Sequence, residues 1–454
     1  MPAAARNRRP RPAGPTDVAG ARLCAYTVLR RVFEHGAYAD RAFTAEAATL
    51  DARDRALAMR LAYGAVQRAG TLDHLIQTLA GRPIDALDAP LRAALRLGCY
   101  ELLFTSGAPP YAIVDDAVEL AKADASRGHG VVNAILRRVL REGPATLLAQ
   151  LSDDTPEHAA IKHSHPEWIA RLWWETLGAQ EARALMAADN EPLELALRAN
   201  TLLTDARRLA RELPARTHLD PVVPEAVVLD EPFDTHGSPL FGAGSFYAQS
   251  RAAMLVAHAL APRPGERVLD LCAAPGGKST HIAALMQGQG EVLAVERHQG
   301  RAAALERTAR RLHAGNVHVR VADAASWATK AGAEFDRVLV DPPCSGLGTL
   351  HARADLRWRV TPDSIEELAD VQARILAAGA RALRPGGVLV YSTCTISAVE
   401  NERLIAAFLD SHADFTLDGP GSVGPHGFAG AGPALTLPHR DRTAGFFIAR
   451  LRRS

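Results

Sequence analysis

The fold of the C-terminal half is decided by residues 268–280, Val268-Leu-Asp-Leu-Cys-Ala-Ala-Pro-Gly-Gly-Lys-Ser-Thr280. Residues 268–271 are predicted to form a short buried strand and residues 273–277 a tight turn, and a helix is expected from Ser279 onward. In α/β proteins this arrangement brings backbone N–H groups to a ligand at the carboxyl edge of a parallel sheet. Glycine suits such a turn, because a Cβ atom would block the approach of the ligand to the backbone.

Two kinds of ligand site are compatible with this turn. Gly277-Lys278-Ser279 suggests a phosphate-binding loop, but that pattern needs glycine at the position of Cys272, and Pro275 stiffens the loop. A nucleoside cofactor instead needs an acidic residue at the end of the next strand. Glu296 ends the apolar run 291–296, where its carboxylate can accept hydrogen bonds from both ribose hydroxyls. The turn and the carboxylate together favour the nucleoside cofactor.

The composition is that of a globular protein of several domains. A chain of 454 residues, 48% of them hydrophobic and with a formal net charge of +1, is too long for one ordinary core. Its apolar runs are all shorter than the roughly 18 residues of a membrane helix, and the N-terminus lacks the apolar core of an export signal. The five cysteines are scattered without a C-x-x-C pair, which predicts neither a zinc site nor disulfides. We therefore expect a cytoplasmic protein without a membrane segment or a bound metal.

Changes in composition and periodicity predict four consecutive regions. Residues 1–15 form a basic, disordered tail, and residues 16–142 are helical throughout. Residues 143–240 are expected to form a small α+β linker region, and residues 241–454 alternate strands and helices. This alternation predicts an open, mostly parallel, doubly wound α/β sheet of the Rossmann-like kind. Its strands are expected near 267–271, 291–295, 317–321, 336–340 and 388–392, with a final pair near 414–417 and 445–451.

The helical region contains several short motifs in a fixed order. These are Tyr63-Gly64, Leu97-Gly-Cys-Tyr-Glu101, Ala117-Val-Glu-Leu-Ala-Lys122 and Val132-Asn-Ala-Ile-Leu136. Periodicity alone predicts an all-α bundle. The motifs resemble the NusB family of RNA-binding antitermination factors over about 130 residues, and this resemblance implies contact with RNA.

Three further polar motifs follow predicted strands, at the edge where such sheets bind ligands. Asp323 ends Val321-Ala-Asp323 and offers a carboxylate to an adenine amino group. Val340-Asp-Pro-Pro-Cys-Ser-Gly346 follows the fourth strand, and Tyr391-Ser-Thr-Cys-Thr395 follows the fifth. A single cysteine at such a place would be a small buried hydrophobe. Two cysteines, each just beyond a strand at one edge of one sheet, predict chemistry instead.

The sequences around residues 272–278, 341–346 and 392–395 resemble the motifs of the S-adenosylmethionine-dependent RNA cytosine-C5 methyltransferases. The pattern covers roughly residues 160–454, and a NusB-like domain ahead of it resembles the bacterial members that act on small-subunit rRNA. Glu296 stands where the family commonly has Asp. Ala248-Gln-Ser-Arg251 lacks the acidic residue that often follows the Gln, so no role is assigned there.

The resemblance implies S-adenosylmethionine as the cofactor and a set of residues around it. The expected cofactor-binding residues are Cys272, Ala273, Ala274, Pro275, Gly276, Gly277, Lys278, Glu296, Asp323 and Asp341. The expected catalytic residues are Cys394 as the nucleophile, Cys344 as the residue that assists release, Asp341 at the edge of the cytosine, and Lys278. The chemistry explains two thiols: one must add to C6 to make C5 nucleophilic, and a base must then remove the C5 proton. Sequence alone does not rank the two, because enzymes acting on DNA attack from a Pro-Cys motif.

The expected substrate is an unpaired or flipped cytosine of small-subunit rRNA, because the target base must leave its stack. We expect a monomer that acts on neither DNA nor membranes. Two alternatives stay open. The same chemistry could act on tRNA or on another rRNA position, or the chain could be an RNA-binding ribosome-assembly factor without catalysis.

Overall fold

The computed structural model describes residues 18–125, 127–327, 332–419 and 432–454. The predicted basic tail, residues 1–15, lies outside them. The chain divides into two compact units: residues 1–190 with 352–359, and residues 191–351 with 360–454. No helix of the described ranges is both long and apolar enough to cross a bilayer. The predicted linker region, 143–240, is divided between the two units.

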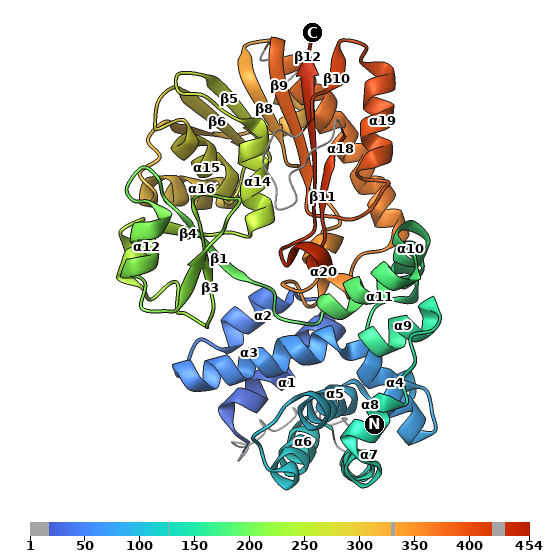
Figure 1. Cartoon of the computed structure of the whole chain (residues 1–454). Helices are drawn as coiled ribbons and strands as arrows, with labels where there is room; N and C mark the ends of the chain where they lie inside the picture. The colour runs from blue at the N-terminus through green and yellow to red at the C-terminus, as the bar shows by residue number, and fades with distance from the viewer. Residues whose placement is uncertain (1–17, 126, 328–331, 420–431) are drawn as a thin grey trace, which may run out of the picture. The chain divides into compact units, whose positions relative to one another are not determined.

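The first unit is entirely helical (Figure 1). Its helices are α1 Gly20–His35, α2 Ala39–Glu46, α3 Ala52–Gln67, α4 Ala69–Ala80, α5 Ala89–Phe104, α6 Pro110–Asp124, α7 His129–Glu142, α8 Pro144–Ala149, α9 Pro156–His163, α10 Glu167–Leu177 and α11 Ala179–Ala188, with short 3₁₀ turns η1 Ile84–Ala86 and η4 Leu356–Trp358. Helix α5 is buried along most of its length. It packs so closely against α3 that a Cβ atom added at Gly64 would lie 2.0 Å from the Tyr100 ring.

Residues 352–359 belong to this helical unit, although the chain enters and leaves them from the second unit. The Arg357 side chain is fully buried and donates to the carbonyl oxygens of Ser164 at 2.8 Å and Asp189 at 3.1 Å. Trp358 Nε1 donates to the Val66 carbonyl at 2.7 Å. Buried carbonyl groups need such donors, so the segment is anchored by hydrogen bonds as well as by packing.

The second unit begins with a small antiparallel sheet in the order β2-β3-β1-β4. Its elements are β1 Leu195–Ala199, α12 Ala206–Glu212, β2 Thr217–Leu219, β3 Ala226–Leu229, α13 Pro239–Gly242 and β4 Phe246–Ala248. Leu197, Val227 and Phe246 from three of the strands meet Leu209 of α12 in a common core. This subdomain is the observed form of the small α+β region.

The rest of the second unit is a mixed sheet in the order β10-β12-β9-β8-β5-β6-β7, with β11 paired to β12. Its strands are β5 Arg267–Leu271, β6 Glu291–Glu296, β7 Val317–Val321, β8 Phe335–Val340, β9 Leu383–Thr393, β10 Phe415–Leu417, β11 Ala434–Thr436 and β12 Phe446–Arg453. Its helices are α14 Arg251–Leu260, α15 Gly277–Leu285, α16 Gln299–Arg311, α17 Ala324–Trp327, α18 Pro362–Ala382, α19 Glu402–Ser411 and α20 Pro438–Asp441, with the 3₁₀ turn η3 Leu347–Thr349.

Strands β5 to β9 of this sheet are parallel, and β12 runs antiparallel to β9. Alternate residues enter opposite cores: Leu339 packs with α14 and α15, whereas Val338 and Val340 pack with α18 and α19. Figure 1 shows these two pairs of helices on opposite faces of the sheet. The α/β fold predicted from the sequence is confirmed. Its central strands are apolar on both faces because helices cover both faces of the parallel sheet.

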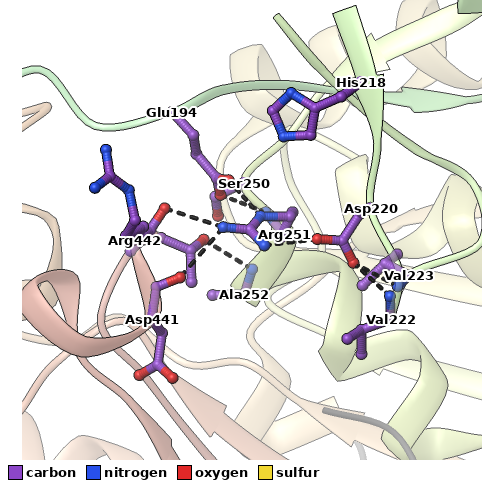
Figure 2. Close-up of polar contacts among 12 residues, drawn as sticks. Glu194, His218, Asp220, Val222, Val223, Ser250, Arg251, Ala252, Asp441 and Arg442 are labelled. Atoms are coloured by element: carbon purple, nitrogen blue, oxygen red, sulfur yellow. Dashed lines mark hydrogen bonds and ion pairs between the residues drawn. The ribbon is translucent and has the colours of Figure 1, made fainter. Parts of the chain in front are cut away.

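Arg251, at the start of α14, joins three parts of the second unit (Figure 2). Its guanidinium contacts Glu194, just before β1, and Nη1 donates to Asp220 Oδ2 at 2.6 Å. Nη2 donates to the carbonyl oxygens of Asp441 at 3.2 Å and Arg442 at 3.1 Å. The sequence assigned no role to residues 248–251, and the structure makes Arg251 a hub of the unit.

Replacing Arg251 is expected to destabilise the second unit. The side chains of Glu194 and Asp220 are 7% and 2% exposed, so Arg251→Ala leaves two buried carboxylates without their cation. Breaking a buried pair in this way costs about 3–5 kcal/mol. Urea unfolding should show this loss in one transition. Arg251→Lys should lose less than Arg251→Ala, because the positive charge is kept, but it should not reach native stability, because an ammonium cannot reproduce the planar fork.

Arg208→Ala provides the control, because the Arg208 pair with Glu212 lies on the exposed surface of α12. That variant should unfold like the native chain. If Arg251→Ala also does, the hub contributes nothing to stability.

Candidate active site

The parallel strands place all the predicted motifs at one edge of the large sheet. β5 pairs with β6 on one side and with β8 on the other. The carboxyl end of β5 is therefore the point where the strand order reverses, and ligands of open α/β sheets bind at such a point. Residues 272–277 follow β5 directly.

The turn after β5 is held by backbone hydrogen bonds. Ala273 N donates to the Val295 carbonyl of β6 at 2.9 Å, and Gly276 N donates to the Ala273 carbonyl at 2.9 Å. Gly276 has φ of +101°, which favours glycine, and helix α15 begins at the next residue. Ala273, Ala274, Pro275 and Gly276 thus form the predicted tight turn, and the helix begins at Gly277, two residues before the predicted Ser279.

A buried arginine from the small sheet supports this turn. Arg198 of β1 donates to Gln249 Oε1 at 2.6 Å and to Thr280 Oγ1 at 2.9 Å, and it also contacts the Gly277 carbonyl. Burial lowers the pKa of Arg198 to about 10, so the guanidinium stays charged at neutral pH. Arg198 was not predicted from the sequence. The available signal was a single arginine inside the apolar strand Leu195–Ala199.

A cavity of about 250 Å³ opens beside the turn. Three predicted cofactor residues, Cys272, Glu296 and Asp323, line it together with Pro343, and Ile375 of α18 contributes apolar surface. The Glu296 side chain is 4% exposed. Its Oε1 accepts from His298 N at 2.9 Å, and its Oε2 lies 3.6 Å from Arg301 Nε. A carboxylate with remaining acceptor capacity at a cavity wall fits the two hydroxyls of a ribose.

Asp323 and Cys272 differ in character. Asp323 is exposed, and its Oδ1 accepts from Ser326 N at 3.0 Å at the start of α17. Burial, with the charges of Asp341 and Asp270, raises the pKa of Cys272 to about 12. Cys272 therefore lines the cavity as a neutral thiol and is not reactive.

The two predicted catalytic thiols lie next to each other. Cys344 Sγ is 3.3 Å from Cys394 Sγ, although 50 residues separate them in the sequence. β8 and β9 pair in parallel with Val340 opposite Tyr391, so the loops that follow them leave the sheet side by side. The hydrogen bond to Cys394 and burial raise the pKa of Cys344 well above the ordinary value of a thiol. These surroundings favour the protonated form of Cys344.

A fully buried carboxylate orders the loop that carries Cys344. Glu400 Oε1 accepts from Ser345 N at 2.8 Å and from Gln372 Nε2 at 2.9 Å, and its Oε2 contacts the Ser345 hydroxyl. Ser345 Oγ is also 2.6 Å from Thr395 Oγ1, in the loop that carries Cys394. Glu400 was not predicted from the sequence. It lies a few residues beyond Thr395, and no local pattern indicates that its side chain points back to Ser345.

Asp341 and Lys278 form an ion pair beside the thiols. Lys278 Nζ donates to Asp341 Oδ2 at 2.7 Å, and Ser392 Oγ donates to Asp341 Oδ1 at 2.8 Å. Burial alone would lower the pKa of Lys278, but the charges of Asp341 and Cys394 raise it above the ordinary value. The ammonium is thus a permanent cation near Cys394, where it favours a thiolate.

Asp270, near the end of β5, is a further carboxyl group of the site that was not predicted from the sequence. Burial raises its pKa to about 7, although Ser279 Oγ donates to it at 2.6 Å. It lies under the turn and fastens the first turn of α15 to the strand.

One group of three potential metal ligands is found in the described part of the chain: Glu225, His258 and His281. His258 Nε2 and His281 Nε2 lie 2.7 Å and 2.5 Å from the same oxygen, Glu225 Oε1. The two imidazoles hold the pKa of Glu225 well below its usual range despite its burial. The hydrogen bond of His258 to Glu225 and the close contact of His281 with the same oxygen fasten the residue before β3 to α14 and α15. The expected absence of a metal stays a prediction.

Three family models match consecutive parts of the chain. The NusB family matches residues 19–141, and a ferredoxin-like domain of RsmF/B-like methyltransferases matches residues 165–236. The model described as 16S rRNA methyltransferase RsmB/F matches residues 257–452.

Individual relatives agree with these models. A probable ribosomal RNA small subunit methyltransferase B of Synechocystis is 37% identical over 96% of this chain and 99% of its own length. The crystal structure of PH0851 is 27% identical, covers 96% of this chain and 99% of its own, and has a TM-score of 0.77. The structure of NSun6 from Pyrococcus horikoshii with SFG is 25% identical over 63% of this chain and 98% of its own, with a TM-score of 0.57.

Glu400 is expected to control the order of the Cys344 loop. Glu400→Ala leaves the Ser345 N–H and hydroxyl without their buried acceptor, which costs about 1–3 kcal/mol. Amide hydrogen exchange in residues 344–347 should therefore quicken by about tenfold or more. Glu402→Ala, two residues away and exposed, is the matched control. Equal exchange in both variants would show that Glu400 does not hold the loop.

Proposed function

The chain belongs to the RsmB/F family of 16S rRNA methyltransferases, as its motifs predicted, and we propose that it methylates C5 of one unpaired cytosine in small-subunit rRNA. The methyl donor in this proposal is S-adenosylmethionine. The observation that carries it is the pair of sulfur atoms 3.3 Å apart, beside Asp341 and next to the cavity that Glu296 lines.

The residues around the cavity fit S-adenosylmethionine. Glu296 suits the ribose hydroxyls, Asp323 an adenine amino group, and Ile375 the face of the base. The related NSun6 structure with SFG, an analogue of S-adenosylmethionine, supports the same cofactor. When bound, the cofactor supplies a methyl group on a sulfonium centre.

Cys394 acts first in the proposed mechanism. Free cysteine has a pKa of about 8.5, so an attacking thiol needs a stabilised thiolate. The nearby ammonium of Lys278 and the S–H of Cys344 both favour negative charge on Cys394. The Cys394 thiolate adds to C6 of the cytosine, and the electron pair of the C5–C6 bond makes C5 able to accept the methyl group.

Asp341 positions the base. Its carboxylate accepts from Lys278 and Ser392 and retains lone pairs for the amino edge of a cytosine. While C6 is bonded to the Cys394 sulfur, the ring takes a proton from solvent at its amino edge and returns it on release, and the same carboxylate stabilises this protonated form. The partners of Asp341 come from α15 and β9, so its orientation is fixed before the base arrives.

Cys344 completes the cycle. Attack turns Cys394 into a thioether. The negative charge that had raised the pKa of Cys344 is then gone, so the pKa of Cys344 falls. Cys344 can then lose its proton to solvent and take the proton from C5. The C6–S bond breaks, its electrons return to Cys394 as a thiolate, and the pair regains its starting state.

The cofactor assignment is tested by calorimetry. S-adenosylmethionine should bind, and ATP with magnesium should not. Glu296→Gln should weaken S-adenosylmethionine binding by about tenfold or more, because hydrogen bonds to a charged group contribute about 1.5–3 kcal/mol. Glu291→Gln, at the opposite end of β6, is the control and should bind like the native chain. Tight ATP binding would contradict the proposal.

The roles of the two thiols are separated by an adduct assay on rRNA fragments. Cys394→Ala removes the attacking group, so neither methylation nor a protein–RNA bond should form. Cys344→Ala permits attack but impairs release, so a covalent adduct should accumulate and survive denaturing electrophoresis. The double variant should form no adduct, and Cys24→Ala, buried in the helical unit, should behave normally.

Other outcomes of the same assay are informative. An adduct in Cys394→Ala and none in Cys344→Ala would reverse the two roles. Full turnover in both variants would exclude the covalent mechanism. Cofactor binding without methylation of any RNA would support a non-catalytic assembly factor.

A further inference from the structure

The helical unit contains a cavity of about 460 Å³, which the proposed mechanism does not use. We call it the Tyr38 pocket. Its polar lining consists of Tyr38, Asp40, Arg41, Tyr63, Arg353, Asp355 and Arg359. The residues come from the start of α2, from α3 and from the segment 352–359, all within the helical unit.

An exposed aromatic ring forms one side of the Tyr38 pocket. Tyr38 is 50% exposed. The guanidinium carbons of Arg359 and Arg41 lie 4.2 Å and 5.0 Å from its ring centre. Aromatic rings and guanidinium planes are the surfaces on which unpaired bases stack. Tyr63 is half-buried and packs edge-on against Phe43 at 5.4 Å, which keeps it in place.

The charges of the pocket are arranged in two zones. Arg41 and Arg353 are exposed, where they can meet phosphate groups. Asp355 is buried, and its Oδ2 accepts from Arg359 Nε at 2.7 Å. Burial raises the pKa of Tyr63 to about 12, and the charges of Asp40 and Asp355 contribute to that shift, so its hydroxyl remains a hydrogen-bond donor. The carboxylates of the pocket would repel a purely anionic ligand. A nucleotide fits better, because its phosphate lies apart from its base, whose amino groups can donate to the carboxylates.

The pocket is joined through the chain to the proposed catalytic loop. The segment 352–359 follows Cys344 after a few residues, and Arg357 and Trp358 anchor it to helices of the first unit. The pocket therefore includes a segment that is continuous in sequence with the loop that carries Cys344.

We propose that the Tyr38 pocket binds one unpaired nucleotide of the rRNA substrate, other than the target cytosine, with its base against Tyr38 and its phosphates against Arg41 and Arg353. The proposal deepens the function given above and rests on RNA being the substrate. It adds a substrate-recognition site within the NusB-like unit.

The first test measures RNA affinity in the full-length chain. Fluorescence anisotropy with single-stranded fragments of small-subunit rRNA should show that Tyr38→Ala weakens binding by about tenfold or more, since stacking of one base on an aromatic ring is worth that much. Tyr38→Trp should retain affinity. Tyr111→Ala, which removes a 71% exposed tyrosine from α6 of the same unit, is the matched control and should bind normally. Native affinity in Tyr38→Ala would overturn the proposal.

A second measurement does not depend on a variant that folds. RNA carrying 4-thiouridine should crosslink, on irradiation, to a peptide that contains Tyr38 or Arg353. Crosslinks confined to other peptides would overturn the proposal.

Parallel methylation assays distinguish failure of the pocket from failure of the proposed reaction. If the native chain methylates cytosine and Tyr38→Ala has the same KM for RNA, the pocket proposal alone fails. If the native chain binds RNA through Tyr38 but methylates no cytosine, the reaction fails and the pocket stands. A raised KM for RNA with nearly unchanged kcat is the result expected if both hold.

Discussion

The parallel pairing of β8 with β9 is the interaction on which the site depends. Val340 lies opposite Tyr391 in the register, and each strand ends within a few residues of its cysteine. Two loops that leave adjacent parallel strands at the same level must run side by side. Glu400 then binds Ser345 in one loop, and Ser345 contacts Thr395 in the other. The short distance between the two sulfur atoms follows from these constraints and not from any sequence proximity.

The same sheet edge brings together the cavity and the two thiols. β5 pairs with both β6 and β8, so Glu296 at the end of β6 and Pro343 after β8 line one cavity beside the turn that follows β5. Lys278 extends from the first turn of α15 to Asp341. The cavity, the Lys278–Asp341 ion pair and the two thiols therefore all lie at the carboxyl ends of neighbouring strands.

Buried arginines connect segments that are distant in the sequence. Arg198 joins the small sheet to the turn at Gly277, Arg251 joins it to residues 441 and 442, and Arg357 holds the segment 352–359 against helices of the first unit. Each guanidinium donates in several fixed directions at once, which an ammonium cannot do. Such contacts need exact partners, whereas apolar packing tolerates substitutions of similar volume.

The sequence by itself determined the strand-turn-helix around residues 268–280, the order of the strands along the chain, and the identity of Cys344 and Cys394 as candidates, because these depend on local periodicity and on short motifs. Only the tertiary structure decided that the two sulfur atoms touch, that Arg198, Arg251 and Glu400 support the site, and that residues 352–359 belong to the helical unit. Hydrogen-bond partners such as Arg357 and Ser164 are 193 residues apart. No local pattern specifies such a pair, because it forms only when the folded backbone brings a buried donor to a carbonyl that has no other partner.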